Sequence, residues 1–255
     1  MATSPCRFVW YELMTRDADA AAKFYVDVVG WTAQKSPHMD YMLFNAGAVQ
    51  VAGAFTLTKE ALDGGARPGW VGYIGVENVD RAAADVKAAA GTVYRGPDDI
   101  PGVGRFAMVA DPQGAAFALF HSANAGQESP ATPGTPGHVA WHELYAGDGA
   151  AVFPFYRDLF GWVAGDAMDM GPAGKYQMFG TAPAAMIGGV MTKPPQMPAP
   201  AWAYYIEVPS IDAASAKVRN GGGQIVQEPQ EVPGGQWTIQ GLDPQGAPFA
   251  LVGAR

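Results

Sequence analysis

Apolar and polar positions alternate at the start of the chain and then change to helical spacing. RFVWYELMT (7–15) alternates as a strand does, with successive side chains on opposite faces. DADAAAKFYVDVVG (17–30) carries apolar residues at helical spacing between an Asp suited to N-capping and a terminal Gly. YMLFNAG (41–47) and AVQVAGAF (48–55) predict two further strands. The predicted order is therefore strand, helix, strands.

The same order follows once more before the middle of the chain. WVGYIGVENV (70–79) predicts a strand, and DRAAADVKAAAG (80–91) predicts a helix with Asp80 at its N-cap and Gly91 at its end. GRFAMVAD (104–111) and AFALFH (116–121) predict strands on either side of the DPQGA stretch. DPQGA is typical of a turn, because Asp caps it, Pro fixes φ and Gly permits a positive φ.

Internal repetition organises the whole chain. FVWYEL (8–13) returns as VAWHEL (139–144), so that Trp141 lies 131 positions after Trp10, and DPQGA recurs with Asp243 132 positions after Asp111. Matches held in register indicate a duplication. SANAGQESPATPGTPG (122–137) is polar and rich in Pro and Gly, which is typical of a linker. We expect one domain at 1–121, a linker at 122–137 and a second domain at 138–255, and a cut in the linker should leave two fragments with separate cores.

Composition and charge narrow the class of protein. The 255 residues are 49% hydrophobic and 16% charged, which indicates a globular chain. The net charge of −8 argues against nucleic acid and anionic membranes as partners. Cys6 is the only cysteine, so no intrachain disulfide can form. No signal peptide and no long apolar run are seen, so a cytoplasmic protein is expected, as a monomer or homodimer.

Taken together, the motifs resemble those of a known family. D-x6-FY-x4-GW, a V-x-x-V-D helix start and DP-x-G before F-x-L resemble the vicinal oxygen chelate superfamily of glyoxalases, bleomycin-resistance proteins and extradiol dioxygenases. The two-domain glyoxalase-like members, loosely labelled hydroxylases, are the most similar. The resemblance implies an α+β fold, in which four βαβββ modules form two tandem domains with cup-shaped mixed β-sheets.

The resemblance also implies where a divalent metal would be held, at four positions in each copy. Those positions are Trp10, about Gly53, Val71 and Ala118 in the first copy, and Trp141, about Gly189, Ala203 and Ala250 in the second. None has a side chain that ligates zinc, iron or manganese. We therefore expect no metal site and no cofactor, which removes the main reason to expect glyoxalase or dioxygenase activity.

The repeated Trp-x-Glu is the candidate site. Alternation places Trp10 and Glu12 on one strand face, and the resemblance implies that this face lines the cup. Trp141 and Glu143 follow in the second copy, and Tyr73 and Tyr205 are expected on the same side of the neighbouring strands. Three interpretations of the glutamates stay open. They accept hydrogen bonds from backbone N–H groups or an arginine such as Arg105, they contact a ligand, or they act as catalytic bases. The tryptophans either fill the core or give a ligand a flat surface.

Two classes of function remain. The first is a metal-independent protein of the bleomycin-resistance type that binds a small, planar or apolar molecule in the cup. The second is an enzyme, a glyoxalase-like lyase or isomerase or a hydroxylase-like protein, that uses Glu12 or Glu143 as acid or base or has an unrecognised metal site. Replacing either glutamate by Gln separates the classes, since a base is needed for turnover and an acceptor is not.

Overall fold

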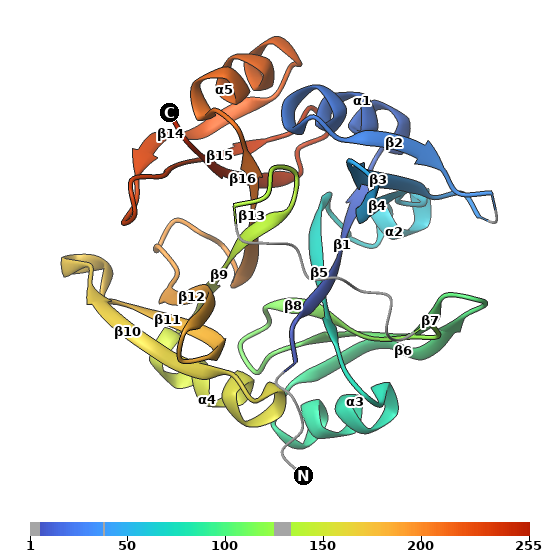
Figure 1. Ribbon diagram of the computed structural model, residues 1–255. Helices are drawn as coiled ribbons and strands as arrows, with labels where there is room; N and C mark the ends of the chain where they lie inside the picture. Colours follow the sequence, from blue (N-terminus) through green and yellow to red (C-terminus); the bar gives the residue numbers. More distant parts are fainter. Residues whose placement is uncertain (1–5, 38, 125–133) are drawn as a thin grey trace. The chain divides into compact units, whose positions relative to one another are not determined.

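The computed structural model describes residues 6–37, 39–124 and 134–255 (Figure 1). In chain order, the elements of the first half are β1 (Phe8–Thr15), α1 (Ala18–Val29), β2 (Thr32–Lys35), β3 (Met42–Ala46), β4 (Val49–Thr56), α2 (Lys59–Asp63), β5 (Gly69–Gly75), α3 (Val79–Ala88), β6 (Thr92–Ile100), β7 (Gly104–Ala110) and β8 (Ala116–Ser122).

The second half repeats this order without a counterpart of α2. Its elements are β9 (Val139–Ala146), α4 (Gly149–Phe160), β10 (Val163–Asp169), the short 3₁₀ helix η1 (Gly171–Ala173), β11 (Lys175–Ala182), β12 (Ala185–Thr192), β13 (Ala201–Val208), α5 (Ile211–Asn220), β14 (Gln224–Glu231), β15 (Trp237–Leu242) and β16 (Pro248–Gly253).

Each half of the described chain forms one eight-stranded mixed sheet. The strand orders are β2-β3-β4-β1-β5-β8-β7-β6 and β10-β11-β12-β9-β13-β16-β15-β14. The first strand of each half pairs parallel with the fourth, while the third and fourth pair antiparallel. Apart from α2 and η1, each half consists of two consecutive βαβββ modules. The α+β fold with four such modules and mixed sheets is thereby confirmed.

Local signals explain most of the helix boundaries. The Asp17 side chain accepts a hydrogen bond from the Ala20 N–H at the start of α1, and Gly30 ends this helix with φ 86°. The N-cap predicted at Asp80 is wrong. Asn78 caps α3 by accepting a hydrogen bond from the Arg81 N–H, and Asp80 lies within the first turn. Asn and Asp cap helices about equally well, so the sequence alone did not separate these two positions.

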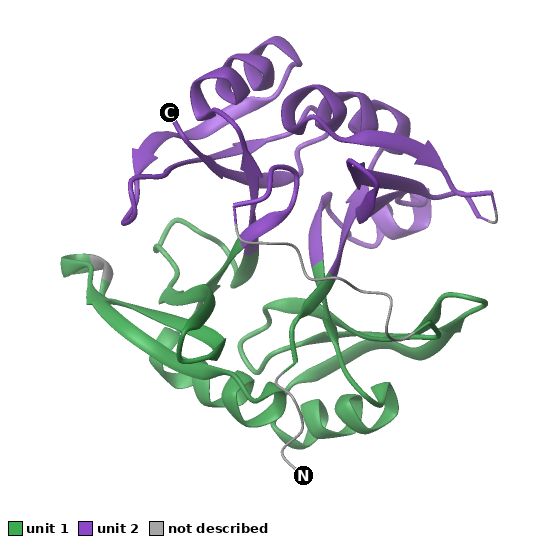
Figure 2. Ribbon diagram, in the orientation of Figure 1, with its two compact units in different colours: residues 1–9, 72–129, 141–202 green, residues 10–71, 130–140, 203–255 purple. Residues whose placement is uncertain are grey.

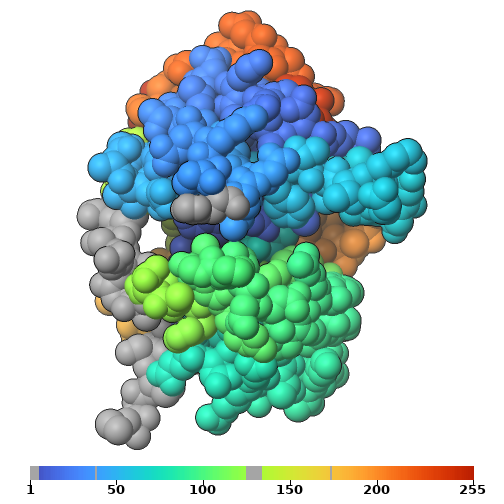
Figure 3. All heavy atoms as spheres, turned by 90° about the vertical axis from the view of Figure 1, so that its right-hand side faces the viewer, coloured from blue at the N-terminus to red at the C-terminus, as the bar shows by residue number. Residues whose placement is uncertain are grey.

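The elements that the apolar pattern did not predict lie at the surface. All four residues of β2 are exposed, and β6 carries mostly polar or partly exposed residues. None of the residues of α2 is buried, and the cyan segment that contains it lies at the surface in Figure 3. Because these segments bury little apolar surface, they leave no clear periodic pattern in the sequence.

The compact units of the chain do not coincide with its two halves. Unit 1 is formed by residues 1–9, 72–129 and 141–202, and unit 2 by residues 10–71, 130–140 and 203–255 (Figure 2). Within unit 1, α3 packs against α4, and within unit 2, α1 packs against α5. Each unit therefore combines one module from each half. The domain boundaries 1–121 and 138–255 remain a prediction, and the predicted linker lies in part (125–133) outside the described residues.

Buried hydrogen bonds inside each unit join the two halves. In unit 2 the Tyr25 hydroxyl of α1 donates to Asp243 of the second DPQGA turn (3.2 Å) and accepts from the Trp70 indole (3.0 Å). In unit 1 Tyr156 donates in the same way to Asp111 (2.9 Å). The other oxygen of Asp111 accepts from backbone N–H groups of its own turn, as predicted for DPQGA. The FY and DPQGA motifs thus recur because each stabilises the other across the halves.

No helix in the described parts of the chain is long and apolar enough to cross a membrane.

Candidate functional site

The repeated Trp-x-Glu lies on the sheet face that is turned away from the helices. In unit 2, Leu13 of β1 belongs to the buried cluster that also contains the apolar residues of α1 and α5, and Tyr11 packs against this cluster. Trp10 and Glu12 alternate with these two residues and therefore point to the other face. The predicted pairing of Trp10 and Glu12 on one face is what the structure describes.

A tyrosine that the sequence did not single out joins Trp10 to Glu12. The Trp10 indole N–H donates to the Tyr41 hydroxyl (3.0 Å), and this hydroxyl donates to Oε1 of Glu12 (2.8 Å). All three side chains are partly buried. The three residues, which we call the Trp–Tyr–Glu cluster of the first sheet, lie within unit 2.

The second sheet repeats this cluster within unit 1. The Trp141 indole donates to the Tyr176 hydroxyl (2.7 Å), which donates to Oε2 of Glu143 (3.3 Å). Glu143 is more deeply buried than Glu12, with 9% of its surface exposed. A buried carboxylate needs hydrogen-bond donors, and the tyrosine supplies one. The same hydrogen-bonded arrangement is therefore present once in each sheet.

A glycine opposite each glutamate makes room for the tyrosine ring. Gly53 of β4 pairs with Glu12, and Gly189 of β12 pairs with Glu143. A Cβ atom built at Gly53 would overlap the ring of Tyr41, and one built at Gly189 would overlap that of Tyr176. The ring therefore lies directly over the glycine in both sheets, at the strand position where the family resemblance places a metal ligand.

The electrostatics keep both tyrosines protonated. Burial, together with the adjacent Glu12 carboxylate, raises the pKa of Tyr41 above its usual value. Burial and Glu143 raise the pKa of Tyr176 in the same way. A neutral phenol donates one hydrogen bond and still accepts others, so each tyrosine serves as acceptor for the indole and donor to the carboxylate. Each glutamate is thereby held in a fixed orientation on the sheet face.

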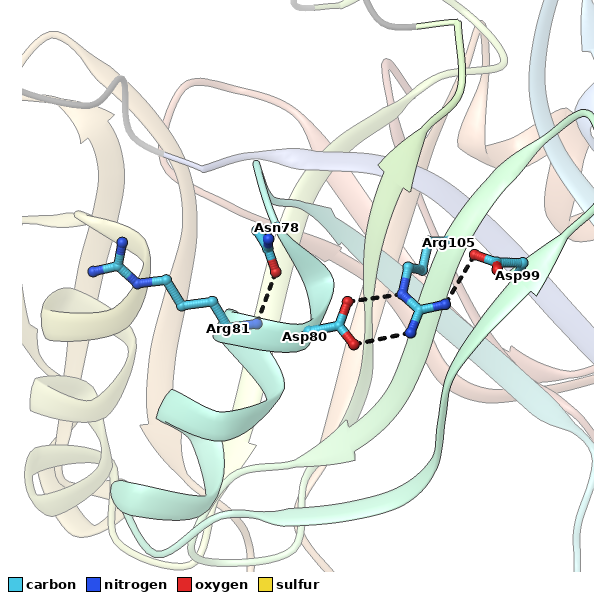
Figure 4. Close-up of polar contacts among 5 residues, drawn as sticks. All are labelled: Asn78, Asp80, Arg81, Asp99 and Arg105. Atoms are coloured by element: carbon cyan, nitrogen blue, oxygen red, sulfur yellow. Dashed lines mark hydrogen bonds and ion pairs between the residues drawn. The ribbon is translucent and has the colours of Figure 1, made fainter.

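Arg105 does not serve as the partner of Glu12. Its guanidinium donates two hydrogen bonds to Asp80 (2.8 and 2.9 Å) and one to Asp99 (2.9 Å), as Figure 4 shows. These contacts join the start of α3 to β6 and β7 within unit 1. The suggested Arg105–glutamate pair is therefore wrong, and Tyr41 is the donor that takes this place.

The two other predicted site residues do not belong to the Trp–Tyr–Glu clusters. Tyr73 of β5 is buried in unit 1, where its ring meets Phe120 edge-on at 6.1 Å between centroids. Tyr205 of β13 is buried in unit 2, and its hydroxyl accepts a hydrogen bond from the Gln240 amide (2.6 Å). The sequence predicts the same role for both tyrosines, and the structure gives them different neighbours, Phe120 for Tyr73 and Gln240 for Tyr205.

The residues at the expected metal positions do not fit a metal ion. Trp, Gly, Val and Ala occupy these positions, and the rings of Tyr41 and Tyr176 lie over the two glycines. Across residues 6–37, 39–124 and 134–255, no three His, Cys, Asp or Glu side chains come together in a way that could hold a metal ion. The chemistry of the donor set therefore gives a metal no ligands at these strand positions.

A small cavity in unit 2 lies on the opposite face of β1 and is too small for a ligand. Tyr11, Trp31 and Tyr204 are among the residues that line it, and its volume is about 10 Å³. That is the space of about one water-sized probe. The candidate site therefore remains the helix-free face that carries the Trp–Tyr–Glu clusters.

Comparison with known proteins agrees with the fold and the duplication. The model of the Glyoxalase/Bleomycin resistance protein/Dioxygenase superfamily matches residues 7–119 and again residues 135–251. These matches cover most of both halves. The chain belongs to this superfamily.

Relatives of similar length are found in Mycobacterium and Streptomyces. "Putative glyoxylase CFP32" of Mycobacterium tuberculosis is 31% identical over 95% of this chain and 93% of its own length. "Anthracycline biosynthesis protein DauV" of Streptomyces sp. (strain C5) is 30% identical over 96% of this chain and 92% of its own length. The Mn(II)-bound glyoxalase of Novosphingobium aromaticivorans has the same fold, with a TM-score of 0.67 and 18% identity over 98% of this chain and 82% of its own.

Proposed function

We propose that this protein binds a small, planar and largely apolar molecule on the helix-free face of its sheets, without a metal ion at the superfamily's usual ligand positions. The observation that carries the proposal is the Trp–Tyr–Glu cluster, present once in each sheet. An indole beside a phenol offers a flat apolar surface, and the carboxylate beside them offers an acceptor.

The relatives support a ligand of this chemical class. DauV carries the name of an anthracycline biosynthesis protein, and anthracyclines contain a flat anthraquinone with hydroxyl groups. A hydroxylated anthraquinone has a large apolar face for stacking and a polar edge for hydrogen bonds. We therefore choose 1,8-dihydroxyanthraquinone as the probe, with unsubstituted 9,10-anthraquinone as its apolar counterpart.

Substitutions in the cluster of the second sheet test the proposal. Trp141→Ala removes the stacking surface and is expected to weaken binding of 1,8-dihydroxyanthraquinone about fivefold or more, which is about 1 kcal/mol. Glu143→Gln keeps the shape of the side chain and is expected to change the affinity less than about threefold. Quenching of tryptophan fluorescence measures both affinities, with the exposed aromatic substitution Tyr94→Ala as a control.

Other outcomes favour the other interpretations. If Glu143→Gln lowers turnover of a bound compound by roughly 10²-fold while affinity is kept, the glutamate is a catalytic base and the protein is an enzyme. If both variants melt at a lower temperature but bind the probe as the wild type does, the cluster is only structural and the proposal is wrong.

A further inference from the structure

The second sheet carries a polar set of side chains on β13 and β15 that the first sheet lacks. Glu207 aligns with Thr238 through Val252, and Tyr205 aligns with Gln240 through Ala250. These neighbours on adjacent strands share one face. The alternating residues Ile206, Ile239 and Leu251 belong to the cluster that packs on α1 and α5, so the polar set lies on the helix-free face of unit 2.

Side-chain amides hold this set together. The Gln236 amide donates to both oxygens of Glu207, at 3.0 and 3.4 Å. The Gln240 amide donates to the Tyr205 hydroxyl at 2.6 Å. Glu207 is only 7% exposed, and burial raises the pKa of its carboxyl group. The Glu207 carboxyl group is therefore buried, and the hydrogen-bond partner found for it, the Gln236 amide, is uncharged.

The first sheet shows that the fold does not require these polar residues. Gly75 stands where the second sheet has Glu207, 132 positions later, and Met108 stands where it has Gln240. Phe120 pairs with Phe106 beside them, so this part of the first sheet is apolar. A side chain at Gly75 would meet Val9, because a Cβ built there lies 2.8 Å from that residue.

Moving the Glu207 carboxyl group out of water costs stability even with the neutral Gln236 amide as its partner, and the first sheet folds with Gly75 at the equivalent position. A buried carboxyl group that the fold does not require indicates a ligand. We propose that Glu207, Gln236 and Gln240 form a subsite of the second sheet that binds the hydroxyl- or keto-bearing edge of a neutral planar molecule. The subsite lies within unit 2, which also holds the Trp–Tyr–Glu cluster of the first sheet, and it rests on the proposed function.

Two variants test the subsite against the two probes. Glu207→Met removes both acceptor oxygens at a similar side-chain length, and Gln240→Met introduces the residue of the first sheet. Each is expected to weaken binding of 1,8-dihydroxyanthraquinone about tenfold and to change binding of 9,10-anthraquinone less than about twofold. Glu77→Met, at an exposed position, is the matched control and should change neither. Melting temperatures show that the compared proteins are folded.

The outcomes separate this inference from the proposed function. If both probes lose affinity equally in the two variants, or if neither does, the subsite is refuted while wild-type binding of the probes still supports the proposed function. If the wild type binds neither probe, the proposed function fails and the subsite fails with it. The subsite is supported only if Glu207→Met and Gln240→Met both weaken binding of the hydroxylated probe and leave binding of the apolar probe nearly unchanged.

Discussion

Neither half of the chain is expected to fold alone when residues 1–129 and 130–255 are produced as separate fragments. Tyr25 donates to Asp243 in unit 2, and Tyr156 donates to Asp111 in unit 1, so each fragment would lose the partner of a buried tyrosine. The cores would be opened as well, since Phe24 packs on Phe249. A typical domain is stable by only about 5–15 kcal/mol, so losing the partner of a buried tyrosine and opening the core is expected to unfold each fragment.

Urea unfolding followed by circular dichroism measures the effect. Each fragment alone should lack a cooperative transition, and an equimolar mixture should regain one. The control is the folded full chain cut once between residues 122 and 137, which should keep its transition because the halves stay associated. Two fragments that unfold cooperatively and independently would contradict this result and would support separate domains at 1–121 and 138–255.

Acidification is expected to destabilise the protein through His142. This residue is buried in unit 1, stacks on Phe8 at 4.3 Å between ring centroids and donates from Nδ1 to the Ile187 carbonyl at 2.6 Å. Burial lowers its pKa from 6.5 to about 4. The unfolded state therefore binds a proton more readily than the folded state. The stability contributed by neutral His142 is fully present above pH 6.5 and is lost as the pH falls toward 4.

The loss amounts to about 2–3 kcal/mol between about pH 7 and about pH 4.5. His142→Gln keeps a donor for the Ile187 carbonyl and has no group that titrates at this position. Between these two pH values, the free energy of unfolding should therefore fall less in the variant than in the wild type, by about 2–3 kcal/mol. Urea unfolding at both pH values gives the difference between wild type and variant. The exposed substitution Val226→Ala is the control and should behave as the wild type. An identical pH dependence in wild type and His142→Gln would show that His142 does not titrate in this way.

The strand alternation and the repeat predicted the order of the elements and the shared face of Trp10 and Glu12, and the resemblance to a known family implied the rest of the fold. Trp10 and Glu12 are two positions apart in a strand, so their shared face follows from backbone geometry. The DPQGA turn could also be predicted, because its Asp caps the turn and its Gly permits a positive φ within the same five residues. These features depend on residues close together in the sequence, and each recurs at a fixed interval in the second half.

The tyrosine of each cluster was not predicted because its spacing differs between the copies. Tyr41 lies 31 positions after Trp10, whereas Tyr176 lies 35 positions after Trp141. A register of 131 or 132 positions therefore does not align them. A usable signal was still present, because Tyr-x-x-Phe precedes a small glycine-containing strand in both halves, at 41–44 and at 176–179.

The sequence pattern did not predict that each compact unit combines one module from each half of the chain. Tyr25 and Asp243 are separated by 218 positions, and each side chain has a satisfactory local interpretation as a helix core residue or a turn cap. Only the hydrogen bond between them shows that the two residues also join the halves of the chain. The difference between Gly75 and Glu207 was visible in the repeat, but its meaning depends on burial.

Probe binding in the presence of a chelator shows whether the protein binds its ligand without a metal ion. The wild-type protein is titrated with 1,8-dihydroxyanthraquinone, with and without excess EDTA, and tryptophan quenching is recorded. Since Trp10, Gly53 and their counterparts offer a metal no ligands, we expect saturable binding with the same affinity in both titrations. Binding that EDTA abolishes and that added Mn²⁺ restores would contradict the account.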